Sequence, residues 1–199
     1  MRRFPLRLWR DRRAVSATEF ALILPFMLII LIGMVEVSGA LDADRKVSRI
    51  ANSITDLVAQ AQTVTSSELK NIADLGGKIL APYPDTDLEV IIASVSFNED
   101  GDASVDWSYD GKVDEDGNLA SPWAKGSVPP ITLPDTVAMP DTSLVISQTN
   151  LAYTPPFSGL LNGVFYGGVN FADRLAIFNL SDTFYLRPRL TDTVRCDDC

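Results

Sequence analysis

The stretch AVSATEFALILPFMLIILIGMVEVSGAL, residues 14–41, decides the fold of this chain. Its centre, residues 20–35, has 16 residues without a charge and spans about 24 Å as a helix at about 1.5 Å per residue. The hydrocarbon core of a bilayer is about 30 Å thick, and uncharged residues beyond the two flanking carboxylates, Glu19 and Glu36, extend the apolar length on both sides. The sequence therefore predicts one membrane helix over residues 14–41.

The charges on either side of this stretch predict its orientation. Residues 1–13 carry six arginines and one acid, a side-chain charge of +5. The whole chain has 17 basic and 26 acidic residues, which leaves 11 basic and 25 acidic residues, a net charge of −14, after the tail. Positively charged flanks stay in the cytoplasm, so we expect the N-terminus inside and the acidic remainder outside. Such an acidic domain is not expected to bind nucleic acid, because that binding requires positive charge.

A cleaved secretory signal peptide is the alternative interpretation of the same stretch. A basic segment followed by an apolar run fits it, and Ser38-Gly39-Ala40 could serve as a small-x-small cleavage site. Glu36 lies directly before that site, and the helical pattern continues through it. These two features favour a retained helix.

The helical pattern continues beyond the membrane segment, with apolar residues at spacings of three and four. Asp42 and Lys46 stand four residues apart with the acid first, the favourable order for an ion pair on a helix. Neither glycine nor proline interrupts the stretch between Ala40 and Gln62, so we predict one helix over residues 14–62, bent inside the membrane at Pro25. The apolar stripe of its outer half comprises Val47, Ile50, Ile54, Leu57, Val58 and Ala61.

A second helix is predicted over residues 66–80. Thr65-Ser66-Ser67-Glu68 has the pattern of a capping box, in which a hydroxyl is followed three residues later by a glutamate. Gly76 and Gly77 weaken this helix by roughly 1 kcal/mol each relative to alanine. Pro82 and Pro84 end it.

After residue 88 the hydrophobic period changes to two, which predicts strands. Residues 88–97 and 103–109 predict a hairpin, and alternation in the second strand places Ala103, Val105, Trp107 and Tyr109 on one face. Further strands are predicted over 143–153 and 183–190, with Pro188 indicating a sheet edge or a strand end. Residues 110–141 and 154–168, rich in proline and glycine, predict long loops, the first with at most one short strand, and 170–178 predict one or two helical turns.

A long helix and an antiparallel sheet of about four strands each supply one apolar face, so they are expected to pack together. The predicted class is α+β, a long N-terminal transmembrane-plus-stalk helix packed on a small antiparallel sheet. The predicted organisation is a cytoplasmic tail (1–13), a membrane helix (14–41) and an extracytoplasmic domain (42–199) with the stalk helix 42–62, the helix 66–80 and a sheet with loops over 88–199.

The N-terminal segment DRR-AVSATEFALILP, with Glu19 just inside the apolar run, resembles the class III signal region of type IV pilin-like proteins. More narrowly, the chain resembles the TadE/TadG-like family of the tight-adherence (Tad, Flp pilus) machinery. The resemblance also includes Ala81-Pro82-Tyr83, Val105-x-Trp107-Ser108, Tyr153-Thr154-Pro155, and the segment 185–189 followed by Cys196. It implies a pilin-like fold and the role of a minor pilin or pseudopilin in the bacterial inner membrane, with a periplasmic domain that contributes to a surface filament used for adhesion. The implied partners are other pilin-like subunits, pilus-machine membrane proteins, the lipid bilayer and a prepilin peptidase.

The resemblance places a processing site between Ala14 and Val15, with Glu19 as the fifth mature residue. Alanine stands where class III prepilin peptidases usually have glycine, so our hypothesis is an uncut, membrane-anchored protein. Glu19 then has two interpretations: a buried carboxylate that pairs with a cation of a neighbouring subunit and sets register, or an interfacial carboxylate near Arg12 or Arg13.

The two cysteines, Cys196 and Cys199, form the sequence Cys-Asp-Asp-Cys. An oxidising compartment favours a disulfide, either within the chain or between chains. A redox role is disfavoured because no thioredoxin-like βαβ pattern surrounds the two cysteines. A zinc site is disfavoured because it would need two further ligands in a chain without histidine.

Catalytic patterns are missing from the sequence. The absence of histidine removes the commonest general base and metal ligand, and neither a P-loop nor a GxSxG motif occurs. The acidic turns around Gly101 and Gly117 fail the EF-hand pattern, which favours solvated turn residues over an irregular calcium site in the loop. Because no catalytic pattern occurs, we expect no enzyme activity and no cofactor. Two further hypotheses remain beside the pilin-like one: an anchored binding or adhesion module that uses the loops 110–141 and 154–168, and an anchored enzyme that uses carboxylates.

Overall fold

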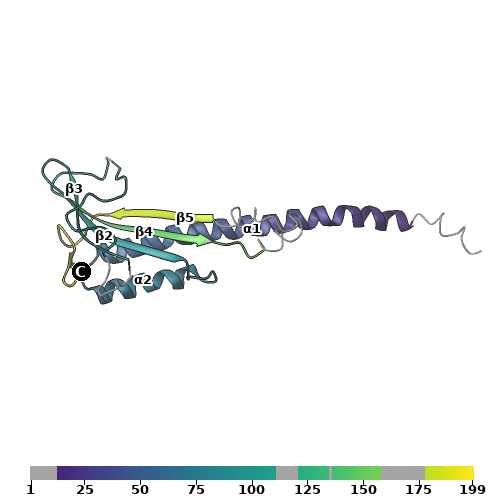
Figure 1. The fold of residues 1–199 in the computed structure, drawn as a ribbon, viewed down its shortest axis with the longest axis horizontal. Helices are drawn as coiled ribbons and strands as arrows, with labels where there is room; N and C mark the ends of the chain where they lie inside the picture. Colours follow the sequence, from purple (N-terminus) through teal and green to yellow (C-terminus); the bar gives the residue numbers. More distant parts are fainter. Residues whose placement is uncertain (1–12, 111–120, 135, 158–177) are drawn as a thin grey trace, which may run out of the picture.

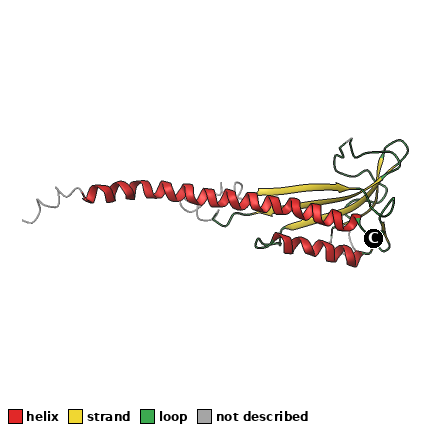
Figure 2. Ribbon diagram, turned by 180° about the vertical axis from the view of Figure 1, so that it is seen from behind, coloured by secondary structure: helices red, strands yellow, loops and turns green. Residues whose placement is uncertain are grey.

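One helix organises the molecule. The computed structural model describes residues 13–110, 121–134, 136–157 and 178–199. Helix α1, Arg13–Ala59, has 47 residues and a length of about 70 Å at about 1.5 Å per residue. It continues through Pro25 and past the predicted membrane boundary at residue 41. Its C-terminal half lies against the sheet, and its N-terminal half projects beyond the other described elements (Figures 1 and 2).

The remaining elements form a small α+β domain around the C-terminal half of α1, which confirms the predicted fold class. Four antiparallel strands have the order β3-β2-β4-β5, and two short strands, β1 and β6, pair in parallel. The elements are β1 (Thr63–Val64), α2 (Ser66–Leu80), β2 (Leu88–Phe97), β3 (Ala103–Tyr109), β4 (Ser143–Tyr153), β5 (Phe178–Leu186) and β6 (Arg195–Cys196).

The apolar stripe of α1 forms the centre of the core. Val47, Ile50, Ile54 and Val58 are fully buried between α1, α2 and the sheet, as the spacing predicted. Leu57 is 42% exposed, so its assignment to the stripe was wrong. The helix ends at Ala59 rather than Gln62 because the carbonyl of Ala59 accepts a hydrogen bond from the N–H of Arg189 (2.9 Å), and the chain then enters β1.

Helix α2 has the predicted bounds and the predicted capping box. The Thr65 hydroxyl accepts from the N–H of Glu68 (3.3 Å), and the Glu68 carboxylate accepts from the N–H of Thr65 (2.9 Å). A Cβ atom at Gly76 would lie 3.3 Å from both Ile50 Cγ2 and Leu88 Cδ2. This glycine lowers helix propensity, but it lets α2 approach α1 and β2 closely.

The hairpin β2–β3 contains an irregularity that the sequence did not predict. Ser94 pairs with Trp107 and Val95 with Val105, so Asp106 is an extra residue in β3. Its carboxylate accepts hydrogen bonds from the hydroxyls of Ser94 (3.1 Å) and Ser96 (2.8 Å). The predicted single apolar face is therefore wrong: Trp107 and Tyr109 join the core beside the helices, and Val105 joins the cluster on the other side.

The last long strand begins earlier than expected. β5 runs from Phe178 to Leu186 instead of 183–190, because its pairing with β4 extends to Tyr153 opposite Phe178. It ends before Pro188 and lies at the sheet edge, as that proline indicated. The helical turns predicted over 170–178 lie, except for Phe178, outside the described residues.

The second face of the sheet is covered by part of the predicted long loop. Trp123 is buried against this face, and four partly buried side chains of the loop pack against the same cluster: Ile131, Leu133, Val137 and Ala138. Ser127 and Gly126 exchange backbone hydrogen bonds with Val105 (2.9 and 2.7 Å). In the predicted loop 110–141, the described residues are 110, 121–134 and 136–141, and they contain no strand. In the predicted loop 154–168, only residues 154–157 are described.

Candidate functional site: the projecting helix and its junction with the domain

The N-terminal half of α1 presents apolar side chains to its surroundings on all sides. Every residue from Val15 to Leu31 is exposed, including Phe20, Leu22 and Phe26. A helix that is hydrophobic all round is stable in a membrane or in contact with other helices, not in water. Helix α1 is long and apolar enough to cross a bilayer.

The residues predicted for processing and register lie at the start of this half. The Ala14–Val15 bond is in the first turn of α1, where the hydroxyl of Thr18 donates to the carbonyl of Val15 (2.7 Å). Glu19 lies one turn beyond Val15 and is exposed. Within the part of the chain that the structure describes, its carboxylate has no hydrogen-bond partner.

The projecting half meets the domain at a cluster of tyrosines around Gly39, which we call the collar (Gly39, Asp42, Tyr83 and Tyr153). A Cβ atom at Gly39 would lie 2.7 Å from the hydroxyl oxygen of Tyr153, so only glycine leaves room for this ring. Tyr83 packs edge-to-face on Tyr153 with ring centroids 5.4 Å apart and donates to the Gly39 carbonyl (3.2 Å) and the Asp42 carboxylate (3.1 Å). Burial, and then the hydrogen bond to Asp42, raise the pKa of Tyr83 above its ordinary 10.0.

Lys46 fixes the collar to the end of α2. Its ammonium group donates to the carbonyls of Ala81 (2.7 Å) and Ile79 (3.2 Å), which are the acceptors that a helix end leaves free. The predicted ion pair between Asp42 and Lys46 is therefore wrong, because each binds another partner. One turn before Gly39, the half-buried Glu36 lies near Tyr153, and burial, followed by the charges of Glu36 and Asp42, raises the pKa of Tyr153.

The opposite end of the domain is held by residues 187–199, which we call the C-terminal clasp. Its strand β6 pairs with β1, Trp107 Nε1 donates to the carbonyl of Val194 (2.8 Å), and Arg189 forms an ion pair with Asp56. The Asp198 carboxylate accepts from the N–H and the hydroxyl of Ser66 (2.6 Å each), at the N-terminus of α2. These two hydrogen bonds, the hydroxyl's first, lower the pKa of Asp198 below its ordinary 3.8.

Cys196 and Cys199 form a disulfide that encloses Asp198. Both thiols are consumed by this bond, so they offer no thiolate to a metal, although Asp198 lies close to them. The clasp contacts the C-terminal end of α1, whereas Ala14, Val15 and Glu19 lie at its start. The structure thus separates the predicted site residues into two groups at opposite ends of the molecule.

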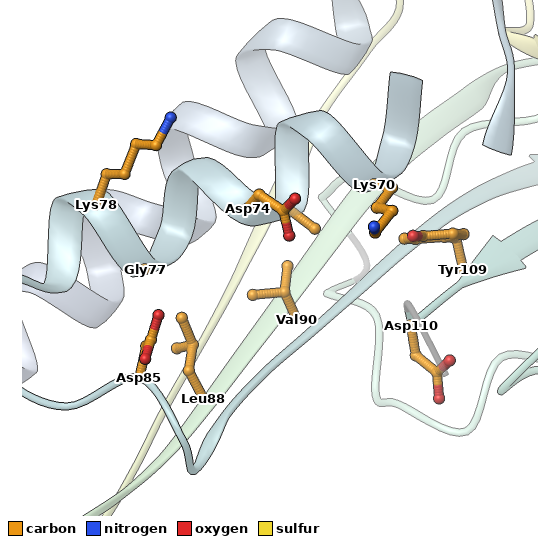
Figure 3. Close-up of a pocket in the computed structure, with 10 residues that line it drawn as sticks. Lys70, Asp74, Gly77, Lys78, Asp85, Leu88, Val90, Tyr109 and Asp110 are labelled. Carbon is orange, nitrogen blue, oxygen red and sulfur yellow. The ribbon is translucent and has the colours of Figure 1, made fainter. Parts of the chain in front are cut away.

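A cleft of about 520 Å³ lies between α2 and the edge of the sheet (Figure 3). Lys70, Asp74 and Lys78 come from α2, and Asp85, Tyr109 and Asp110 from the opposite side, with Lys70 directed toward Tyr109. Two lysines and three aspartates line it, and its lining residues include neither cysteine nor histidine. The arrangement corresponds to no nucleophile–base pair.

Sequence reasoning missed the collar and the contact between Asp198 and Ser66. A glycine inside a helical pattern can indicate that another segment approaches the helix backbone closely, and Gly39 was such a signal. The partner of Asp198 had no local signal, because Ser66 is 132 positions away.

The fold and the projecting helix define a class: an α+β protein with a long, apolar N-terminal helix that fits a membrane anchor. Residues 14–53 match the model of the family described as TadE-like protein. The predicted resemblance is therefore confirmed, over the segment that forms the projecting helix and the first part of the stalk. This family is associated with the Tad pilus. Neither a curated protein nor a solved structure matches the chain significantly.

Proposed function

We propose that this protein is a minor pseudopilin of a Tad/Flp-type pilus assembly and secretion machine, anchored in the bacterial inner membrane with its domain in the periplasm. It acts by packing its N-terminal helix against the helices of other pilin-like subunits and pilus-machine membrane proteins. The observation that carries the proposal is the coincidence of the TadE-like match, residues 14–53, with the helix that leaves its apolar side chains uncovered up to Leu31.

Glu19 supports this role because it is the only charged residue between Val15 and Val35. A carboxylate inside a bilayer is costly unless it is paired, and a cation of a neighbouring subunit would supply the pair. An exposed carboxylate on a helix surrounded by apolar side chains has the placement that such pairing between subunits requires. We propose that Glu19 sets the register of packing.

The test compares pilus formation and copurification in cells that carry Glu19→Gln or Glu99→Gln in place of the natural chain. Glu99 lies in the exposed turn between β2 and β3, so its variant controls for the loss of one carboxylate. We expect Glu19→Gln to lose pili and to lose the pilus-machine membrane proteins that copurify after gentle solubilisation, and Glu99→Gln to keep both. Normal pili and normal copurification in Glu19→Gln would refute the role of this residue, and the absence of pilus proteins from the natural chain's complex would refute the function.

Processing is tested separately by intact mass. We propose that the chain stays uncut at Ala14–Val15, so the membrane-extracted protein should have the full mass of residues 1–199. A mass that lacks residues 1–14 would contradict this. Cleavage would then create a new N-terminal amino group at Val15, which could serve as the cation for Glu19. Substitution of Ala14 by glycine tests whether residue 14 blocks a prepilin peptidase, because cleavage should then appear.

A further inference from the structure

We propose that the domain sits directly on the outer surface of a zwitterionic bilayer through a rim formed by Phe157 and Phe178, with the collar tyrosines immediately behind it. The proposal rests on the membrane anchorage in the proposed function. It adds a second lipid contact, made by the folded domain instead of the helix.

The length of the exposed helix places the bilayer surface at the rim. From Val15 to Val35, α1 has 21 residues, about 31 Å at about 1.5 Å per residue, which equals the thickness of a hydrocarbon core. The headgroup layer adds about 5 to 7 Å on each side, or about four more helical residues. Gly39, which contacts the Tyr153 ring, therefore lies within the headgroup layer and not beyond it.

The side chains at this level suit such a layer. Tyr153 ends β4 and pairs with Phe178 at the start of β5, so both lie at the end of the sheet that faces the projecting helix (Figure 1). Phe178 is 45% exposed, and Phe157, four residues beyond the end of β4, is 41% exposed. By contrast, the aromatic side chains inside the domain are buried: Phe97, Trp107, Tyr109, Trp123 and Tyr153. Aromatic rings are enriched at the membrane–water interface, where tyrosine hydroxyls remain hydrated.

The charges near the rim select the lipid. Glu36 and Asp42 lie on α1 beside the tyrosines, and Asp87 borders a hollow that also includes Ala152 and Asn179. The nearby ammonium group of Lys46 is bound to two backbone carbonyls. Among the described residues near the rim, four acids (Glu36, Asp42, Asp44 and Asp87) outnumber two cations (Arg45 and Lys46), so the rim should approach zwitterionic headgroups and be repelled by anionic ones.

The experiment uses tryptophan fluorescence of the full-length protein in phosphatidylcholine vesicles that carry bromines high on the acyl chains. Trp9 is replaced by phenylalanine throughout, and the buried Trp107 and Trp123 give a constant background. The rim probes are Phe157→Trp and Phe178→Trp. Leu190→Trp is the matched control, because Leu190 is 62% exposed and adjoins Arg189 at the far end of α1, and Leu24→Trp reports insertion of the helix.

We expect strong quenching of Leu24→Trp, clear quenching of both rim probes and none of Leu190→Trp. Phosphatidylglycerol added to the vesicles should reduce quenching of the rim probes and leave Leu24→Trp unchanged. Unquenched rim probes together with a quenched Leu24→Trp would overturn the rim contact alone. A rim probe whose emission is blue-shifted but unquenched would also overturn it, because the probe would then be buried against protein and not against lipid. An unquenched Leu24→Trp would overturn the membrane anchorage on which the proposed function depends. Stronger quenching of the rim probes with phosphatidylglycerol would overturn the lipid preference.

Discussion

Replacing Ile50 by alanine should leave a cavity between α1 and α2 and so test the position of the core. Ile50 is fully buried, and its Cγ2 atom lies 3.3 Å from the place that a Cβ of Gly76 would occupy. The substitution removes three carbon atoms, worth about 0.8 kcal/mol each in transfer free energy. Gly76 has no side chain that could move into the space, so a cavity remains and raises the expected loss to about 3 to 4 kcal/mol.

The assay is thermal or urea unfolding of the full-length protein in detergent micelles. A loss of this size should lower the melting temperature by about 10 °C, since a chain of this length shifts by about 2 to 4 °C per kcal/mol. Leu57→Ala is the control, because it shortens an apolar side chain of the same helix that is 42% exposed, and its effect should be less than half as large. Equal losses in the two variants would refute the assignment of the buried face of α1.

Three further predictions concern the C-terminal clasp. Because hydrogen bonds from Ser66 lower the pKa of Asp198, the contribution of its carboxylate to folding stability is present above the ordinary pKa of 3.8 and is lost as the pH falls through the lower folded pKa. The melting temperatures of the natural chain and of Asp198→Asn should therefore differ at pH 5 to 7 and converge in acid. A difference that stays constant with pH would contradict this. Trp107→Phe leaves the Val194 carbonyl without its indole donor and should lower the free energy of unfolding by about 1 to 3 kcal/mol in urea titrations, whereas an unchanged midpoint would exclude a role for this hydrogen bond. Replacing Cys196 and Cys199 by serine should cost less than about 2 kcal/mol, because the ring is short, but should speed amide exchange at Ser66 without changing exchange within β4.

Local patterns predicted the helices well. Spacing alone placed Val47, Ile50, Ile54 and Val58 on the buried face, and the Thr65–Glu68 capping box fixed the start of α2. These signals are local in sequence and act within one or two helical turns. Leu57 was misassigned because the apolar stripe of an amphipathic helix has a finite width, and a residue at its margin cannot be placed without the partner surface.

Features that depend on pairing between distant segments were harder to predict. The bulge at Asp106 appears only when β3 is aligned with β2, and a shift of one residue moves every following side chain to the other face. The start of β5 at Phe178 is set by Tyr153 opposite it. For the candidate site, the sequence predicted the exposed helix, and Glu19 as a register residue stays a prediction. The collar required knowledge of where β4 ends, and the contact of Asp198 with Ser66 joins residues 132 positions apart in the sequence.

The unbroken course of α1 makes it a lever. In the proposed anchorage its N-terminal part lies in the bilayer, and its C-terminal part, from Glu36 to Ala59, is about 35 Å long at about 1.5 Å per residue. Membrane helices tilt by about 20° on average, and by more where the hydrocarbon layer is thin; such a tilt about residue 36 would displace Ala59 sideways by about 12 Å. In a membrane-anchored protein, the stiffness of this one helix would therefore couple lipid thickness to the lateral position of the domain.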